Sequence, residues 1–437
     1  HWTRDHGPEF IIGEDHWEVI NQQFNGYPEN YGCNFREAEI NDDSNLNILE
    51  RKEIEGRPID SQFRAWDEDD DTNIDFANQL GWDIFNLPLY WTGGNFMTDG
   101  YGMGFSTQLM VNENNMTNEA FQEIMYQELH FNDYHIFDNP NQLSIQHIDC
   151  MAKLVGPETI IIKQVSESSP EYNCIENFAN SFYQLNTFYD RPFKIYRIFC
   201  PIVNGGWWEI NPVAAYTNSL ILNNRVLVPQ YGIIQDELAL QTYRDAMPGY
   251  EVIGFDDSNS DPWYAEDALH CRTMGIFDPE MIHISHKSIR TGEVNTNQIP
   301  ISADIIDYGG INVESVEVHW KYSAEDGPYG VFNLDFESGN TYSGTFSNIN
   351  FNTETEYFIK VTNIEGKTIS HPIAGWHSFT INTIIGDING DNLLNVQDVI
   401  LTVNLVLDNE FDYSADLNGD AQINIQDIVL LVNIILN

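Results

Sequence analysis

Short apolar runs alternate with amphipathic segments over the first two thirds of the chain. β-branched and aromatic residues gather in runs that predict strands, among them Thr159–Val165, Phe193–Phe199 and Leu220–Pro229. Apolar residues at steps of three and four predict helices, among them Asn118–Glu128, Glu171–Leu185 and Asp236–Ala246. Such alternation predicts an α/β domain over residues 1–292. Residues 14–71 break the pattern, because they are polar and end in the acidic run Asp67–Asp71, so we expect an acidic, loop-rich insertion there.

The pattern changes after Pro300, where apolar and polar residues alternate between turn signals. The predicted strands are Ser315–Tyr322, Tyr329–Phe336, Asn340–Ser347 and Glu356–Thr362. Alternation of this kind predicts an all-β sandwich of immunoglobulin or fibronectin type over residues 296–381.

The last fifty residues contain one sequence motif twice, each copy followed by an apolar helix at Val396–Leu407 or Ile425–Leu436. Oxygen-bearing side chains occupy positions one, three, five, nine and twelve of a twelve-residue loop in each copy. They are Asp387, Asn389, Asp391, Asn395 and Asp398 in the first loop, and Asp416, Asn418, Asp420, Asn424 and Asp427 in the second. Calcium takes about six to eight oxygen ligands around a sharp turn, which Gly390 and Gly419 would supply. We predict a module at 384–437 that binds two calcium ions; acidic turns that only cap helices are the alternative.

The net charge of the chain limits the kinds of partner that it can bind. Among 437 residues, 67 are acidic and 19 are basic, so the formal net charge is −48. Such a field repels nucleic acid and anionic membranes and attracts cations, whether a basic substrate, calcium or salt. No apolar stretch is long enough for a transmembrane helix. We expect a secreted or cell-surface protein. Because the number of cysteines, five, is odd, at least one thiol lies outside any intramolecular disulfide.

Three polar strings combine residue types suited to guanidinium hydrolysis. Residues 2–8 include Asp5, residues 146–149 include His147 and Asp149, and residues 267–273 include Cys271. Paired carboxylates bind the planar, cationic guanidinium through its N–H groups. A thiolate attacks its central carbon, and an imidazole transfers the protons. Strand alternation would place His147 and Asp149 on the same side. Each string alone is a weak signal, but together they predict this chemistry.

The same strings carry a family resemblance. Residues 1–290 resemble the bacterial peptidylarginine deiminases, relatives of agmatine deiminase in the guanidino-group-modifying superfamily. The matching strings lie at residues 2–5, 92–102, 147–150, 216–225, 246–250 and 267–273. The resemblance implies an α/β propeller of ββαβ units around a central site, with much of the first unit missing from this sequence. An immunoglobulin-like domain follows the deiminase domain in that family as well. Residues 386–437 resemble a type I dockerin, which binds two calcium ions and docks onto a cohesin partner.

Residue roles follow from the deiminase resemblance. It implies guanidinium-binding carboxylates at Asp5 and Asp149, an acid/base at His147, a nucleophile at Cys271, a further polar group at Asn218, and Trp2 packed on the substrate. Cys271 would form a covalent amidino-thioether, and water would release citrulline without any metal. The implied activity is hydrolysis of an amidine C–N bond in peptidyl-arginine.

The sequence departs from the family pattern at the residues expected to bind a substrate carboxylate. An Arg-Pro-Arg string upstream of Gly-Gly-Asn corresponds here to Arg64, Ala65 and Trp66, so only Arg64 remains. An aromatic residue before His147 is replaced by Ser144. We therefore expect weak preference for a C-terminal arginine. An agmatine deiminase, an amidino group transferase and a non-catalytic adhesin or scaffold remain alternatives.

Overall fold

The computed structural model describes residues 3–13, 16–24, 71–141, 145–203, 213–256, 263, 268–294, 296–324, 330–382, 384–390 and 393–436. Backbone contacts divide the chain into two units, His1–Pro279 and Glu280–Asn437. Within the described ranges, no helix is both long enough and apolar enough to span a membrane.

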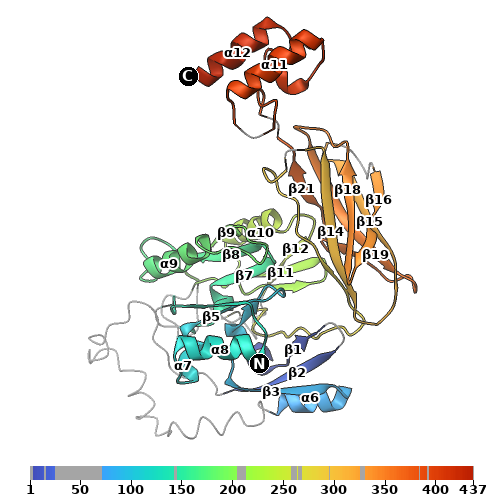
Figure 1. The fold of residues 1–437 in the computed structure, drawn as a ribbon. Helices are drawn as coiled ribbons and strands as arrows, with labels where there is room; N and C mark the ends of the chain where they lie inside the picture. Colours follow the sequence, from blue (N-terminus) through green and yellow to red (C-terminus); the bar gives the residue numbers. More distant parts are fainter. Residues whose placement is uncertain are drawn as a thin grey trace. The chain divides into compact units, whose positions relative to one another are not determined.

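Among its described residues, the first unit contains four three-stranded sheets with the same topology. The elements of these sheets can be followed in Figure 1. They are β1 (Glu9–Ile12), β2 (Trp17–Gln23) and β3 (Asp83–Tyr90); β4 (Met97–Thr98), β5 (Met103–Thr107) and β6 (Asp133–Phe137); β7 (Ala152–Gly156), β8 (Thr159–Gln164) and β9 (Lys194–Phe199); and β10 (Leu220–Leu222), β11 (Arg225–Gln230) and β12 (Glu251–Asp256). In each sheet the first two strands are antiparallel and the last two are parallel. The first unit is therefore a mixed α/β structure of four ββαβ repeats.

Helices lie in the parallel crossovers, because parallel neighbours need a long connection that returns to the same edge. The helices are α6 (Thr72–Leu80), α7 (Gln108–Glu113) with α8 (Asn118–Glu128), α9 (Tyr172–Tyr183), and α10 (Gln235–Ala246). Helix α9 shows how they pack: Phe178 and Phe182 are buried, and their ring centroids lie 5.0 and 4.8 Å from that of Phe137 on β6. Neighbouring repeats therefore share one aromatic core.

Most predicted elements of this unit are confirmed to within two residues at each end, and α8 has its predicted bounds. The predicted strand Leu220–Pro229 is wrong as a single element, because the structure divides it into β10 and β11. Asn223 between them has φ of 53°, a left-handed conformation that asparagine tolerates in a tight turn.

The expected loop-rich insertion needs one correction. Its residues 17–23 form β2, which pairs with β1 on one side and β3 on the other. Val19 and Ile20 are buried, so these apolar side chains give the strand a core contact that the polar surroundings conceal in the sequence. Residues 25–70 of the predicted insertion lie outside the described residues.

The second unit begins with two sheets over one core. One sheet has the order β13 (Ile282–Ser285), β14 (Gln298–Asp307), β18 (Thr341–Ser347) and β17 (Asp335–Ser338). The other has β16 (Gly330–Asn333), β15 (Val313–Tyr322), β19 (Glu354–Asn363) and β20 (Thr368–His371), with β21 (His377–Thr380) also paired to β19. Alternate residues of β14 and β19 are buried in a shared core. The predicted strand Tyr329–Phe336 is instead divided between β16 and β17, which belong to different sheets.

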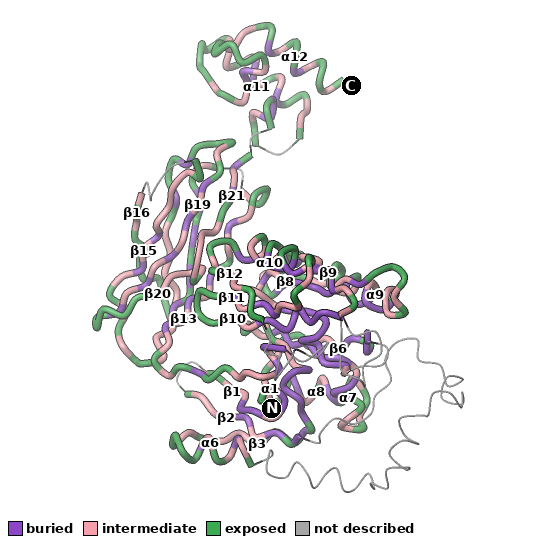
Figure 2. The backbone as a smooth tube through the Cα atoms, turned by 180° about the vertical axis from the view of Figure 1, so that it is seen from behind, coloured by how far each residue is buried: buried purple, intermediate pink, exposed green. Residues whose placement is uncertain are grey.

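Two helices end the second unit, α11 (Val396–Asp408) and α12 (Ile425–Leu436), as predicted. Both helices have large exposed faces (Figure 2). Gly390 and Gly419 each have φ of 72°, which confirms the sharp turn expected in the loop before each helix.

Candidate active site

The candidate site residues lie where the ββαβ repeats begin and end. Helix α1 (Thr3–His6) precedes the first repeat, the 3₁₀ turn η1 (Gly93–Asn95) precedes the second, and η2 (Ile148–Cys150) precedes the third. Asn218 precedes the fourth repeat, and residues 268–271 follow it. Equivalent positions in successive repeats are thereby gathered in one place, although they are far apart in sequence. We call these five pieces the site segments.

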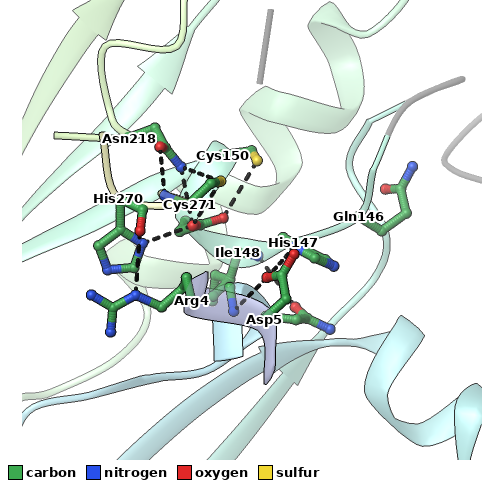
Figure 3. A network of polar contacts seen from close by, with 12 residues as sticks. Arg4, Asp5, Gln146, His147, Ile148, Cys150, Asn218, His270 and Cys271 are labelled. Carbon is green, nitrogen blue, oxygen red and sulfur yellow. Dashed lines mark hydrogen bonds and ion pairs between the residues drawn. The ribbon is translucent and has the colours of Figure 1, made fainter. Parts of the chain in front are cut away.

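Hydrogen bonds join the five site segments in a closed ring, most of which is drawn in Figure 3. The bonds run from Gly94 N to Asp5 Oδ1 (3.2 Å), Ile148 N to Asn95 Oδ1 (3.2 Å), Asn218 Nδ2 to Asp149 Oδ2 (3.0 Å), Cys271 N to Asn218 Oδ1 (3.1 Å) and Arg4 N to Cys271 O (3.2 Å). Each segment therefore positions the next one, and the last positions the first.

Cys271 is held against two polar side chains of this ring. Asn218 Nδ2 donates to its Sγ at 3.1 Å, and the Sγ lies 3.6 Å from Asp149 Oδ2. Asn218 Oδ1 also accepts from the backbone N–H of Ala268 and Cys271. The amide of Asn218 thus fixes both the turn and the thiol that the turn presents.

Asp149 is a buried carboxylate, so its ionised form is destabilised by the loss of hydration. Burial raises its pKa to about 7, the nearby charge of Asp5 adds to the increase, and Lys153 and Arg4 oppose it. A bound guanidinium would supply the positive charge that favours ionised Asp149. The site is therefore suited to a cationic ligand.

The side chains of Asp5 and His147 lie close to each other and to Gly94. His147 Nδ1 lies 3.5 Å from Asp5 Oδ1, and burial lowers the pKa of His147 although Asp5 acts in the opposite direction. A Cβ added to Gly94 would lie 2.7 Å from both of these atoms and 3.4 Å from Asp149 Oδ2. Three candidate groups therefore face one point, and only glycine leaves space there.

The predicted strand at His147 and Asp149 is wrong. His147 is the extended residue before η2, and Asp149 lies within this 3₁₀ turn. The backbone follows the turn because Asn95 Oδ1 accepts from Ile148 N, while Thr107 Oγ1 donates to Gln146 O at 2.5 Å. The compact turn, rather than strand alternation, brings both side chains to the site.

Several residues at the site are absent from the sequence prediction. His270 Nδ1 lies 2.7 Å from Asp149 Oδ2, and its place beside Cys271 in the matching string was the available signal. Gly94 and Asn95 belong to the matching Gly-Gly-Asn string. Lys153 is buried, and its pKa is lowered to about 7, chiefly by burial. No motif singled out this lysine.

Some predicted positions cannot be placed. Trp2 and Arg64 lie outside the described residues, as do Trp66, Ser144 and Asp391. The structure brings together Asp5, His147, Asp149, Asn218 and Cys271 (Figure 3).

Comparison with known proteins assigns the chain to a class of enzyme. Residues 1–276 match the family model for Porphyromonas-type peptidyl-arginine deiminase. The enzymes of this class hydrolyse the C–N bonds of amidines, and the chain is such a hydrolase. It belongs to the Porphyromonas-type peptidyl-arginine deiminase family.

Individual relatives carry agmatine deiminase names. A protein of Enterococcus faecalis named "Putative agmatine deiminase" is 24% identical over 305 residues, which are 62% of this chain and 73% of the relative. One of the same name in Lactococcus lactis is 24% identical over 303 residues, with the same coverage. The solved agmatine deiminase of Enterococcus faecalis has a TM-score of 0.48 at 20% identity, and the match covers 62% of this chain and 73% of that one.

Proposed function

We propose that the chain hydrolyses the guanidinium group of arginine in peptides or proteins to citrulline and ammonia. The observation behind this proposal is the placement of the Cys271 thiol between Asn218 and Asp149, in the same ring that holds Asp5 and His147. The residue types match what guanidinium hydrolysis needs: two carboxylates, an imidazole and a thiol.

The first half-reaction forms a covalent intermediate. Asp5 and Asp149 accept hydrogen bonds from the guanidinium N–H groups and orient its central carbon. Neutral His147 takes the thiol proton, and the Cys271 thiolate adds to that carbon. His147 passes the same proton to the departing nitrogen, the C–N bond breaks, and ammonia leaves an amidino-thioether on Cys271.

The second half-reaction uses water. Neutral His147 removes a proton from the water, which adds to the amidino carbon. The C–S bond then breaks and the electron pair returns to Cys271 as thiolate. The net change is guanidinium plus water to a ureido group plus ammonium, so charge and atoms balance.

The agmatine deiminase names of the relatives support a second substrate, since agmatine carries the same guanidinium without the α-carboxylate. Ammonia release from benzoyl-arginine amide, peptides with C-terminal arginine, free arginine and agmatine distinguishes the two proposals. We expect turnover of both arginyl peptides to exceed that of agmatine, and internal and C-terminal arginine to differ by less than about tenfold in kcat/KM. Faster turnover of agmatine would identify the small-molecule enzyme.

Cysteine variants provide the matched control for that assay. Cys271→Ala is expected to abolish ammonia release. Cys200 is another buried cysteine, and its Sγ donates to the backbone oxygen of Ile198 at 3.6 Å. It belongs to none of the site segments, so Cys200→Ala should retain activity. Ammonia release by the Cys271→Ala variant at the rate of the unchanged chain would contradict the proposed nucleophile.

We also propose that the C-terminal loops bind two calcium ions and that helices α11 and α12 dock onto a cohesin-type partner outside the cell. The loops offer oxygen ligands, the donor type that calcium prefers. Within the described residues, no three His, Cys, Asp or Glu side chains form a metal-binding group; the proposed sites also include asparagine oxygens. Exposed apolar side chains on both helices, such as Ile400 and Ile434, support a docking role.

Calcium should raise the melting temperature of the full chain, because an ion that binds only the folded state stabilises it. Asp416→Ala should reduce this effect. Identical melting curves with calcium and with a chelator would contradict the calcium proposal. The two sheets over residues 282–380 support the proposed immunoglobulin-like domain.

A further inference from the structure

His270 directly precedes the proposed nucleophile and contacts the buried carboxylate beside it. Its Nδ1 lies 2.7 Å from Asp149 Oδ2, and the two side chains are 15% and 4% exposed. The His270 N–H donates to Asn218 O at 3.1 Å, and Arg4 Nε donates to His270 O at 3.4 Å. The backbone N–H and C=O groups of His270 are therefore both hydrogen-bonded, which fixes the position from which its side chain reaches Asp149 (Figure 3).

The protonation state of His270 follows from its surroundings. Burial lowers its pKa well below the usual value, and the charges of Lys153 and Arg4 lower it further. A neutral imidazole carries one N–H group. Because ionised Asp149 accepts at the Nδ1 side, the proton belongs on Nδ1, and His270 is the donor.

Asp149 Oδ2 has three donors from later parts of the chain. They are His270 Nδ1 at 2.7 Å, Asn218 Nδ2 at 3.0 Å and Cys271 Sγ at 3.6 Å. The His270 contact is the shortest of the three. Donors to the charged form of a carboxyl favour that form, which opposes the effect of burial.

We propose that His270 is a positioning residue that keeps the Asp149 carboxylate ionised and turned toward the substrate guanidinium. This role rests on the proposed function, since it concerns the same site. His270 itself transfers no proton in the reaction.

Other charges around Asp149 have to be separated from this effect. The titratable and charged groups that face it are Arg4 and Asp5 of α1, His147, Cys150 of η2, Lys153 of β7, and Cys271. All of them are present in both His270→Leu and His270→Asn, which differ in the hydrogen-bond donor at position 270. A change in the titration of Asp149 in such a variant therefore reports the lost donor.

The test compares the pH dependence of kcat/KM in the unchanged chain, His270→Leu and His270→Asn. Leu removes the donor, so the pKa of Asp149 should rise and the acidic limb should move to higher pH by about one unit or more, equivalent to about 1.4 kcal/mol. His270→Leu should then lose about tenfold or more below the limb, chiefly through KM, and approach normal activity above it. The amide of Asn can donate from nearly the same place, so His270→Asn should restore most of the shift.

A matched control is His319→Leu, which removes a histidine with a carboxylate partner (Glu317 Oε2, 3.3 Å) in the second unit. It should leave the profile unchanged. An equal loss at every pH in His270→Leu, with the midpoint unmoved, would overturn the proposal and indicate a purely structural role. Equal profiles for His270→Leu and His270→Asn would also overturn it.

A second measurement separates this proposal from the proposed function. The titration of Asp149, followed by carboxyl ¹³C NMR in the Cys271→Ala variant, requires no turnover. If no guanidino compound is hydrolysed by the unchanged chain, the proposed function fails, while a higher Asp149 midpoint in a His270→Leu, Cys271→Ala double variant still supports the His270 contact. An unmoved midpoint overturns the proposal whatever the activity.

Discussion

Asp149 at the candidate site and Asp427 in the second C-terminal loop are both buried carboxylates with hydrogen bonds, but their partners differ. Asp427 accepts from the backbone N–H groups of Leu417, Asn418 and Asn424, all within ten residues. Asp149 accepts from the side chains of Asn218 and His270, 69 and 121 residues later. One carboxylate closes a loop, and the other joins distant segments.

This difference in partners predicts a structural role for Asp427 and a role in substrate binding for Asp149. Backbone donors are fixed once the loop has formed, so Asp427 stabilises the turn before α12. The side-chain donors of Asp149 come from separate site segments, and we propose that they hold its carboxylate toward an incoming guanidinium. Asp398 repeats the Asp427 pattern in the first loop, accepting from Ile388, Asn389 and Asn395. Both C-terminal loops therefore use their last aspartate to accept the same three kinds of backbone hydrogen bond.

The largest contrast should appear in catalysis. Asp149→Asn removes the charge that we propose binds the guanidinium and should lower kcat/KM at least about a hundredfold, the scale of losing a directly acting group. Asp427→Asn should leave kcat/KM for arginyl peptides unchanged, because its donors belong to its own loop. Comparable losses in the two variants would show that the carboxylates do not differ in role.

A smaller effect should follow from filling the space that the site groups face. Gly94→Ala would place a methyl group 2.7 Å from Asp5 Oδ1 and His147 Nδ1, so these groups must shift. We expect about a tenfold loss in kcat/KM and a lower melting temperature, since overpacking a buried position costs about 1–3 kcal/mol. Gly156→Ala is the control, since a Cβ there meets nothing within 4 Å. Full activity of Gly94→Ala would show that Asp5, His147 and Asp149 do not need the space beside Gly94 for catalysis.

The smallest effect concerns local stability of the tail. Asp427→Asn weakens acceptance of backbone N–H groups, which should cost about 1 kcal/mol. Amide hydrogen exchange at Leu417 and Asn418 should become about fivefold faster, while amides of η2 stay protected. Asp408→Asn, at an exposed carboxylate at the end of α11, provides a control outside the loop. Unchanged exchange in Asp427→Asn would contradict its role in closing the loop.

The same contrast explains what the sequence could predict. The turns and helices around Asp398 and Asp427 depend on contacts within twelve residues, so spacing alone predicts them. The α9 and α10 helices likewise follow from local periodicity. The bond between His270 and Asp149 depends on how four repeats close into a ring, and no local pattern contains that information. The 3₁₀ turn at Asp149 was mistaken for a strand because its bond to Asn95 comes from another repeat.

Alkylation by a haloacetamidine probe, located by mass spectrometry, is the direct test of Cys271 as the nucleophile. The probe combines an amidinium, which Asp5 and Asp149 should bind, with a carbon that a thiolate attacks. The described free thiols are Cys150, Cys200 and Cys271. We predict that Cys271 is labelled first and that Asp149→Asn slows its labelling strongly. Labelling of Cys150 ahead of Cys271, or equal labelling of all three, would contradict the assignment of Cys271 as the nucleophile of this ring.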